Sequence, residues 1–363
     1  MEADRVASME SAEWTQDNNY ISIATAGSPL ELKARRIACQ RVLLAQLNVI
    51  PIEEWMSRVN AMHDRIALTA AAICEAQMKE AGYGPPPCAY SFIVFGSAGR
   101  QESTLWSDQD NGLIVEGEPD GEKRSYFGAF GTMMSDVLEQ AGYEKCEGKV
   151  MCSEPLWRKT LTEWKEQLHS WMNQLEWEPV RYLLIASDMR HVAGSEELSA
   201  RWREAFHTGF AGNDKLSTAV LRNTVRHKAT LNLLGQVLTE RFGDHAGEFD
   251  IKYGVYIPLV NIVRHTALLH GIQDNSTLNR LRALEGLDKY PHLEDIRRAF
   301  LTALRMRVNT PYSDVEGLLS SSDYIAESDL KNKQLLSELR ESLLIVRRLH
   351  KALQRQLRSA ERR

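Results

Sequence analysis

Long apolar runs are missing from this sequence. No stretch approaches the ~20 consecutive apolar residues that a membrane-spanning helix needs. The first residues, MEADRVASMESAEWTQ, are acidic and polar rather than signal-like. We therefore expect neither a membrane partner nor a secretory signal.

Cysteine is scarce and carries no recognisable pattern. The five cysteines are scattered, odd in number and without a C-x-x-C pair, which favours reduced packing thiols in a cytoplasmic protein. The ten histidines include no H-E-x-x-H motif, so a zinc site is not expected.

An excess of positive charge is also lacking. The formal net charge is −5, so no global field favours nucleic acid as a partner. No internal repeat or low-complexity tract stands out. With 363 residues, 43% of them hydrophobic and 26% charged, the chain has the composition of a folded protein of two or three domains.

Three parts can be distinguished along the chain: an N-terminal helical region (1–88), a mixed part (89–195) and a helical part (196–363). Residues 1 to about 28 look frayed. Apolar residues then recur at helical spacing from Leu30 to Met78, until the prolines of AGYGPPPCAY stop the helix. Further helices are expected over Tyr126–Ala141, Leu156–Leu175, Leu216–Arg241, Tyr256–His270, Thr277–Leu287 and Leu330–Arg358.

The stretch YSFIVFGSAGRQESTLWSDQDNGLIVEG (90–117) carries the chemistry. SFIVF and GLIV indicate two buried strands, and Gly96 with Ser97 opens a turn into a short helix, AGRQESTLW. Glycine there lets the backbone approach a ligand, the first helical N–H groups are free for an anion, and Arg100 adds a permanent positive charge. The pattern predicts a phosphate-holding turn.

Asp108 and Asp110 stand two residues apart at the start of the second strand. On a strand both side chains leave the same face, and paired carboxylates with a substrate phosphate suit Mg²⁺. Two such ions stabilise the attacking and leaving oxygens in nucleotidyl transfer. The alternative is that both are ordinary turn residues, since Ser-Asp-x-Asp-Asn is rich in turn formers.

The whole string resembles the signature of the DNA polymerase β-like nucleotidyltransferase superfamily: Gly-Ser, a short helix, then D-x-D. The variant G-S-x-G-R-x-E-x-x-x-x-S-D-x-D is similar to the PII-protein uridylyltransferases and glutamine-synthetase adenylyltransferases, and SDQDN to a bacterial nucleotidyltransferase-like family often fused to CBS domains. The resemblance implies an α+β fold with a small mixed sheet, and Mg²⁺ or Mn²⁺ as cofactor. It also implies nucleotide contacts at Gly96, Ser97, Arg100, Glu102 and Ser107.

The superfamily also implies a third carboxylate on a later strand. RYLLIASDMRHVAG offers one, because the apolar run Tyr182–Ile185 is followed by Asp188, then Arg190 and Gly194. Asp188 would complete the catalytic, metal-binding set with Asp108 and Asp110. The alternative is a surface aspartate paired with Arg190.

The third part resembles the helical substrate-binding domain of the CBS-linked family. The family's pattern falls on Asp250, Lys252, Arg264, His270, Ile272, Ser276, Thr277, Arg280 and Leu281. By this resemblance Lys252 and Arg264 would contact the triphosphate in a cleft that closes on the nucleotide. Alternatively both are solvated or paired with Asp250 and Glu248, and Ser276 or Thr277 is simply a helix N-cap.

The resemblance implies transfer of an NMP from ATP or UTP to a hydroxyl acceptor on a regulatory protein, with release of pyrophosphate. A small-molecule acceptor and a catalytically silent nucleotide-sensing or partner-binding module are the alternatives. No CBS, ACT or HD segment is recognisable, which leaves regulation open, and a homo-oligomer is compatible with the sequence.

The last helical stretch, LLIVRRLHKALQRQLRSAERR, is basic. We interpret it as an amphipathic helix whose basic end suits its own dipole. A surface for RNA or an acidic partner is the alternative.

Overall fold

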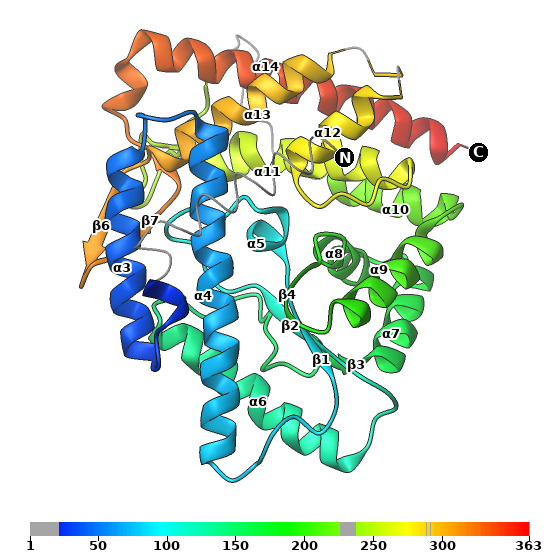
Figure 1. The fold of residues 1–363 in the computed structure, drawn as a ribbon. Helices are drawn as coiled ribbons and strands as arrows, with labels where there is room; N and C mark the ends of the chain where they lie inside the picture. Colours follow the sequence, from blue (N-terminus) through cyan, green and yellow to red (C-terminus); the bar gives the residue numbers. More distant parts are fainter. Residues whose placement is uncertain (1–21, 226–236, 288, 291, 363) are drawn as a thin grey trace. The chain divides into compact units, whose positions relative to one another are not determined.

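The computed structural model describes residues 22–225, 237–287, 289–290 and 292–362 (Figure 1). They form two compact units. The first comprises the residues up to Glu166 together with Asp188–Arg203, and the second comprises Gln167–Ser187 together with the residues from Glu204 onward. The N-terminal helices thus share a unit with the sheet instead of forming a part of their own. None of the described helices is both long and apolar enough to cross a membrane.

Two long helices open the first unit, α3 (Pro29–Gln46) and α4 (Ile52–Glu80). Ser28 caps α3, since its hydroxyl accepts from the Glu31 N–H, and Pro29 occupies a position where no N–H is needed. The helical prediction for 30–78 is confirmed apart from the break between the two helices. The prediction that residues 1 to about 28 are frayed is wrong from residue 22 onward, since residues 22–24 are helical and Ile23 is buried. Residues 1–21 lie outside the described residues.

A four-stranded mixed sheet lies at the centre of the first unit, as predicted. Its order is β3-β2-β1-β4, with β1 antiparallel to β2 and β4 and with β2 parallel to β3. Both strands predicted from the apolar runs are present and wholly buried. The strands are β1 (Tyr90–Val94), β2 (Asn111–Val115), β3 (Arg158–Thr160) and β4 (Arg190–Gly194).

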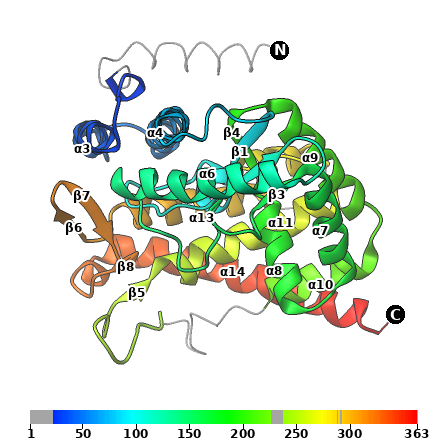
Figure 2. The ribbon, with the colours of Figure 1, turned by 90° about the horizontal axis from the view of Figure 1, so that it is seen from below.

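Helix α6 (Gly121–Gln140) packs against α3, α4 and β3 (Figure 2). Its buried aromatic side chains Phe127 and Phe130 contact Tyr90 of β1. The helix expected over 156–175 begins later, as α7 (Leu161–Asn173), because residues 158–160 pair with β2 as a strand. Elsewhere in this unit, successive aromatic ring contacts connect Phe95, Trp157, Trp164 and Trp202.

The apolar run Tyr182–Ile185 is not part of a strand. It belongs to α8 (Trp177–Ala186), whose buried Val180, Leu183 and Leu184 recur at helical spacing. The strand, β4, begins only after Asp188, so the position expected for the third carboxylate precedes the strand.

The second unit is helical almost throughout, as predicted. Residues 252–264 are continuous in helix, because a π-helical turn (Lys252–Tyr256) leads directly into α11. No loop separates Lys252 from Arg264. The other helices are α9 (Glu196–Phe210, in this unit from Glu204), α10 (Asp214–Thr224), α11 (Ile257–Leu269), α12 (Thr277–Glu285), α13 (Leu293–Val308) and α14 (Lys333–Ala360).

Two short strand pairs in this unit were not expected: β5 (Phe249–Asp250) with β8 (Tyr324–Ile325), and β6 (Tyr312–Val315) with β7 (Leu318–Ser321). A 3-10 turn (Asp329–Lys331) precedes α14. The helix expected over 216–241 is described only as α10. Residues 226–236 lie outside the described residues, and 238–241 are not helical.

Candidate functional site

The turn after β1 brings the glycine-serine pair against one of the two carboxylates. Gly96 begins α5 (Gly96–Arg100) with a φ of 54°, and a Cβ at this position would lie 2.3 Å from Asp110 Oδ2. Phe95 N–H donates to Asp110 O at 2.9 Å. Only glycine therefore lets the Asp110 carboxylate lie on the turn. Gly99 has a similar role, since its Cβ would lie 2.0 Å from the backbone oxygen of Asp188.

Asp108 and Asp110 precede β2 rather than lie on it, because the strand begins at Asn111. The side chains of residues 108–111 nevertheless alternate between the two sides of the segment, as they do in any extended chain. Gln109 and Asn111 are buried, at 3% and 2% exposure, whereas Asp108 is exposed and Asp110 half-buried. The two carboxylates thus share one side of the segment, as expected.

The buried amides tie this segment to α6 and to the loop 143–152. Gln109 Nε2 donates to Ser135 O and to Tyr143 O, each at 3.1 Å. Asn111 Oδ1 accepts from Cys152 N–H at 2.8 Å, and Asn111 Nδ2 donates to Gln109 Oε1 at 3.4 Å. The DQDN sequence therefore combines two outward acids with two inward amides that hold them in place.

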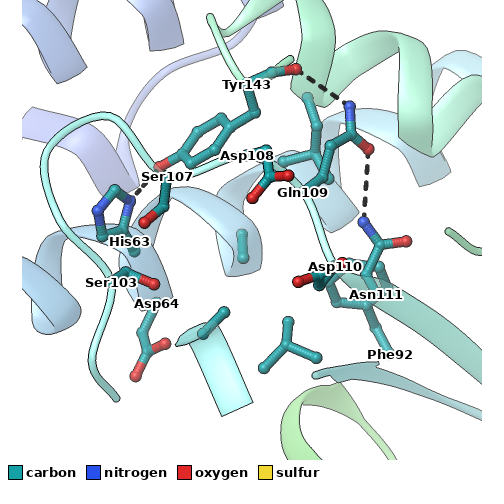
Figure 3. A pocket seen from close by; sticks show the side chains of 14 residues that line it. His63, Asp64, Phe92, Ser103, Ser107, Asp108, Gln109, Asp110, Asn111 and Tyr143 are labelled. Atoms are coloured by element: carbon teal, nitrogen blue, oxygen red, sulfur yellow. Dashed lines mark hydrogen bonds between the residues drawn. The ribbon is translucent and has the colours of Figure 1, made fainter. Parts of the chain in front are cut away.

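The two carboxylates line a pocket of about 440 Å³, part of it open to solvent. Figure 3 shows Asp108 and Asp110 facing the pocket, with the Gln109 amide turned toward Tyr143. The hydroxyl residues Ser103 and Ser107 also line the pocket, and the Ser107 hydroxyl accepts from the Thr104 N–H at 3.0 Å. The apolar lining comes mainly from Phe92, Val94, Ala98 and Leu138.

Helix α4 contributes His63 to the pocket wall, a residue that the sequence reasoning missed. Its Nε2 lies 2.8 Å from the carbonyl of Thr104, so Nε2 carries the proton, and Nδ1 accepts from the Tyr143 hydroxyl at 2.7 Å. Burial, and next the charge of Arg36, lowers the pKa of His63 to about 3. His63 is therefore a neutral, fixed wall residue. A histidine on the apolar face between Val59 and Ile66 was the available signal.

Asp64 also lines the pocket and was also missed. Both of its oxygens accept from Arg190, at 2.6 and 2.9 Å, and Arg190 donates further to Ala98 O. The pair ties α4 to β4 and to the turn after β1. Arg190 is thus paired with Asp64, and Figure 3 places Asp64 apart from Asp108 and Asp110.

Asp188 is not among the residues that line this pocket. It is completely buried, and Arg100 Nη1 donates to its Oδ2 at 2.6 Å. Arg100, 4% exposed, also donates through Nε to Glu102 Oε2 at 2.8 Å. Arg100, Glu102 and Asp188, which were expected to contact the nucleotide or the metal, thus form a buried ion cluster. Their spacing in sequence could not reveal this, since Asp188 lies 88 positions from Arg100.

Two further residues lie close to the turn and the carboxylates: Ser97, which was predicted to contact the nucleotide, and Cys146, which was not. Ser97 is half-buried in α5, and its hydroxyl accepts from Ser103 at 3.5 Å. Burial, and next the neighbouring Asp110, raises the pKa of Cys146 to about 12, so this thiol stays protonated beside the carboxylate.

Lys252 and Arg264 lie in the second unit. Lys252 Nζ is 3.5 Å from Asp323 Oδ2, a carboxylate that also accepts from Arg307. Arg264 is only 7% exposed, and its Nη1 donates to Asn261 Oδ1 at 2.7 Å. Neither side chain is simply solvated. The carboxylate paired with Lys252 is Asp323, whereas the alternative interpretation named Asp250 and Glu248.

The donor set at the pocket suits a hard divalent cation held in part by substrate. Asp108 and Asp110 offer carboxylate oxygens on one side of the pocket, and Mg²⁺ is commonly bound by one or two carboxylates with phosphate and water as further ligands. Among the described residues, no cluster of three or more His, Cys, Asp or Glu side chains could hold a metal ion by itself. The two aspartates therefore fit a metal that arrives with its nucleotide.

A mixed sheet with a glycine-serine turn and two carboxylates beside it defines a nucleotidyltransferase-type fold. Comparison with family models agrees: "Putative nucleotidyltransferase DUF294" matches residues 39–178, and "Putative nucleotidyltransferase substrate binding domain" matches residues 214–357. The chain belongs to this nucleotidyltransferase family, which confirms the resemblance read from the motif. No curated protein matches the chain.

Proposed function

We propose that this protein transfers an NMP from an NTP to a hydroxyl acceptor and releases pyrophosphate. The observation that carries the proposal is the pair Asp108 and Asp110, which face one pocket beside the Gly96 turn and are held there by buried amides. In the reaction the acceptor oxygen forms a bond to the α-phosphorus, the bond from that phosphorus to the bridging oxygen breaks, and the hydroxyl proton is released.

The residues in and around the pocket would have different roles in the reaction. Asp108 and Asp110 would hold Mg²⁺ or Mn²⁺, which when bound neutralises phosphate charge at the reacting centre. Ser97, Ser103 and Ser107 would donate hydroxyl hydrogen bonds to phosphate oxygens. Arg100, Glu102 and Asp188 would act by positioning the turn, since their charges pair with one another away from the pocket.

The acceptor that we propose is a hydroxyl on a regulatory protein, with ATP or UTP as donor. This part rests on the likeness of the motif G-S-x-G-R-x-E to the PII and glutamine-synthetase modifying enzymes, and on the family's substrate-binding domain.

The test is NTP turnover by Asp108→Asn and Asp110→Asn. Each should lower pyrophosphate release by about 100-fold or more, because the substitution removes a charge needed in the transition state. Neither should lower the free energy of unfolding, since neighbouring like charges repel in the metal-free protein. The matched control is Glu147→Gln, an exposed carboxylate of the 143–152 loop, which should leave turnover unchanged. Turnover that persists in both aspartate variants would contradict the proposal.

A second candidate is a nucleotide-binding module without turnover. It is favoured by one observation: Asp188 is paired with Arg100 and is not among the residues that line the pocket of Asp108 and Asp110. The two candidates separate in calorimetry with ATP or UTP. Metal-dependent binding without pyrophosphate release, over every acceptor offered, supports the module.

We further propose that Lys252 and Arg264 bind the outer phosphates of the nucleotide. Lys252→Ala and Arg264→Lys should then weaken NTP binding by about tenfold and NMP binding far less, as expected for the loss of one charge-assisted contact. Isothermal titration with NTP and NMP measures the ratio. An unchanged ratio in a folded variant assigns that residue a structural role, which its contacts with Asp323 or Asn261 would then explain.

A further inference from the structure

The outer face of α14 carries four cations in one line, and a fifth follows in the turn just beyond its end. Arg348, Lys351, Arg355, Arg358 and Arg362 follow one another at alternating spacings of three and four residues, and all five are exposed. Residues at this spacing lie on the same face of a helix. We call these five residues the cationic stripe.

The opposite face of α14 is seated in the second unit, which determines the direction of the stripe. Leu353 packs with Leu221 of α10 and Ile262 of α11, and the partly buried Leu349 and Leu357 join this cluster. His350 Nε2 also bonds to Val225 O at 2.8 Å. The apolar side of the helix is therefore used within the fold, and the stripe faces outward.

The charge of the stripe is not neutralised nearby. Within the described chain, none of the five cations forms an ion pair. Arg355 Nε donates to the backbone oxygen of Lys351, and Glu361, the acid nearest the end of α14, is paired with Arg222. No acidic residue occurs from 342 to 360. A net acidic chain, at −5, thus concentrates unpaired positive charge on one helix.

We propose that the cationic stripe is a docking surface for an acidic helical segment of a partner protein. At 1.5 Å per residue the four cations on α14 extend over about 15 Å, with about 5 Å between neighbours. A second helix laid along α14 presents carboxylates at the same three- and four-residue spacing, so that four charge pairs form in register along the helix, and a fifth glutamate faces Arg362 just beyond it. This inference goes beyond the transfer reaction and does not depend on it.

Other polyanions match the stripe less well. Single-stranded nucleic acid is held by cations together with aromatic side chains that stack on the bases, and α14 contains no Phe, Tyr or Trp. A duplex strand curves away from a straight line of charges. Binding to an anionic membrane also requires inserted apolar side chains, and the only large hydrophobic residue exposed on α14 is Leu344.

The experiment uses the full chain and a variant with all five stripe residues replaced by Gln. The probe is a synthetic helical peptide with five glutamates at three- and four-residue spacing. A second peptide has the same composition with its glutamates distributed around the helix. The matched control protein carries Arg41→Gln, Lys79→Gln, Lys165→Gln, Lys215→Gln and Lys289→Gln, five exposed cations on other elements. Circular dichroism verifies folding of each.

The unaltered chain and the control variant should bind the in-register peptide at least about tenfold more tightly than the stripe variant, since several exposed charge pairs act together. Added salt should weaken that binding. Three results would overturn the proposal: equal loss in the control variant, equal affinity for the two peptides, or tighter binding of an RNA or DNA duplex or of anionic vesicles than of the peptide.

Discussion

Single residues at this site act through their neighbours. Arg100 shows this most clearly, because a guanidinium expected to contact phosphate instead bridges two buried carboxylates, Glu102 and Asp188. Removing one member of a buried ion pair leaves an uncompensated charge, which costs far more than the pair contributes. The role of Arg100 is therefore visible in stability as much as in nucleotide binding.

We expect Arg100→Gln to lower the free energy of unfolding by about 3–5 kcal/mol, and more than Asp188→Asn does. The first substitution strips two carboxylates of their partner, whereas the second leaves Arg100 paired with Glu102. Urea unfolding measures both, with the exposed Arg124→Gln as a control that should change little. If Arg100→Gln instead leaves stability intact and abolishes NTP affinity, the guanidinium contacts phosphate as the motif suggested.

At the scale of elements, the carboxylates are placed by a brace between the lead-in to β2 and the 143–152 loop. The brace consists of hydrogen bonds made by the buried side-chain amides of Gln109 and Asn111 rather than of regular sheet pairing. Residues outside any strand can therefore be held as firmly as strand residues.

Gln109→Ala should lower the free energy of unfolding by about 2–4 kcal/mol, because two buried carbonyls lose their donor. Amide hydrogen exchange should rise over 143–152, and turnover should fall because Asp108 and Asp110 lose their support. Gln174→Ala is the control, since the Gln174 amide donates only to the exposed Ser170 hydroxyl. Unchanged exchange over 143–152 would show that the brace is not needed.

Across the whole molecule, each unit contains a buried neutral histidine. Burial, and next Arg36, lowers the pKa of His63 to about 3, and burial lowers the pKa of His265 to about 4. In the unfolded chain both titrate near about 6.5. Between these values the unfolded chain binds more protons than the folded one, so stability is complete above about pH 6.5 and falls as the pH is lowered.

We expect each histidine to remove about 2 kcal/mol from the free energy of unfolding of its unit between pH 6.5 and pH 5. His265→Leu should flatten this dependence for the second unit, whereas His169→Gln, a substitution at an exposed site, should leave it unchanged. The free energy of unfolding of each variant, measured with denaturant at pH 6.5 and pH 5, tests this prediction. A variant that remains as acid-sensitive as the original chain would exclude His265 as a cause.

The sequence alone determined the elements that depend on local physics. The apolar runs SFIVF and GLIV predicted both central strands, helical periodicity predicted α4, α6, α11 and α14, and the motif predicted the family and the outward pairing of Asp108 with Asp110. Only the tertiary structure decided the partners of charges. Asp188 with Arg100, Asp64 with Arg190 and Lys252 with Asp323 are joined across 88, 126 and 71 positions. The physical reason is that a local pattern specifies which face a side chain takes, whereas burial of a charge depends on whichever opposite charge the folded chain brings within reach.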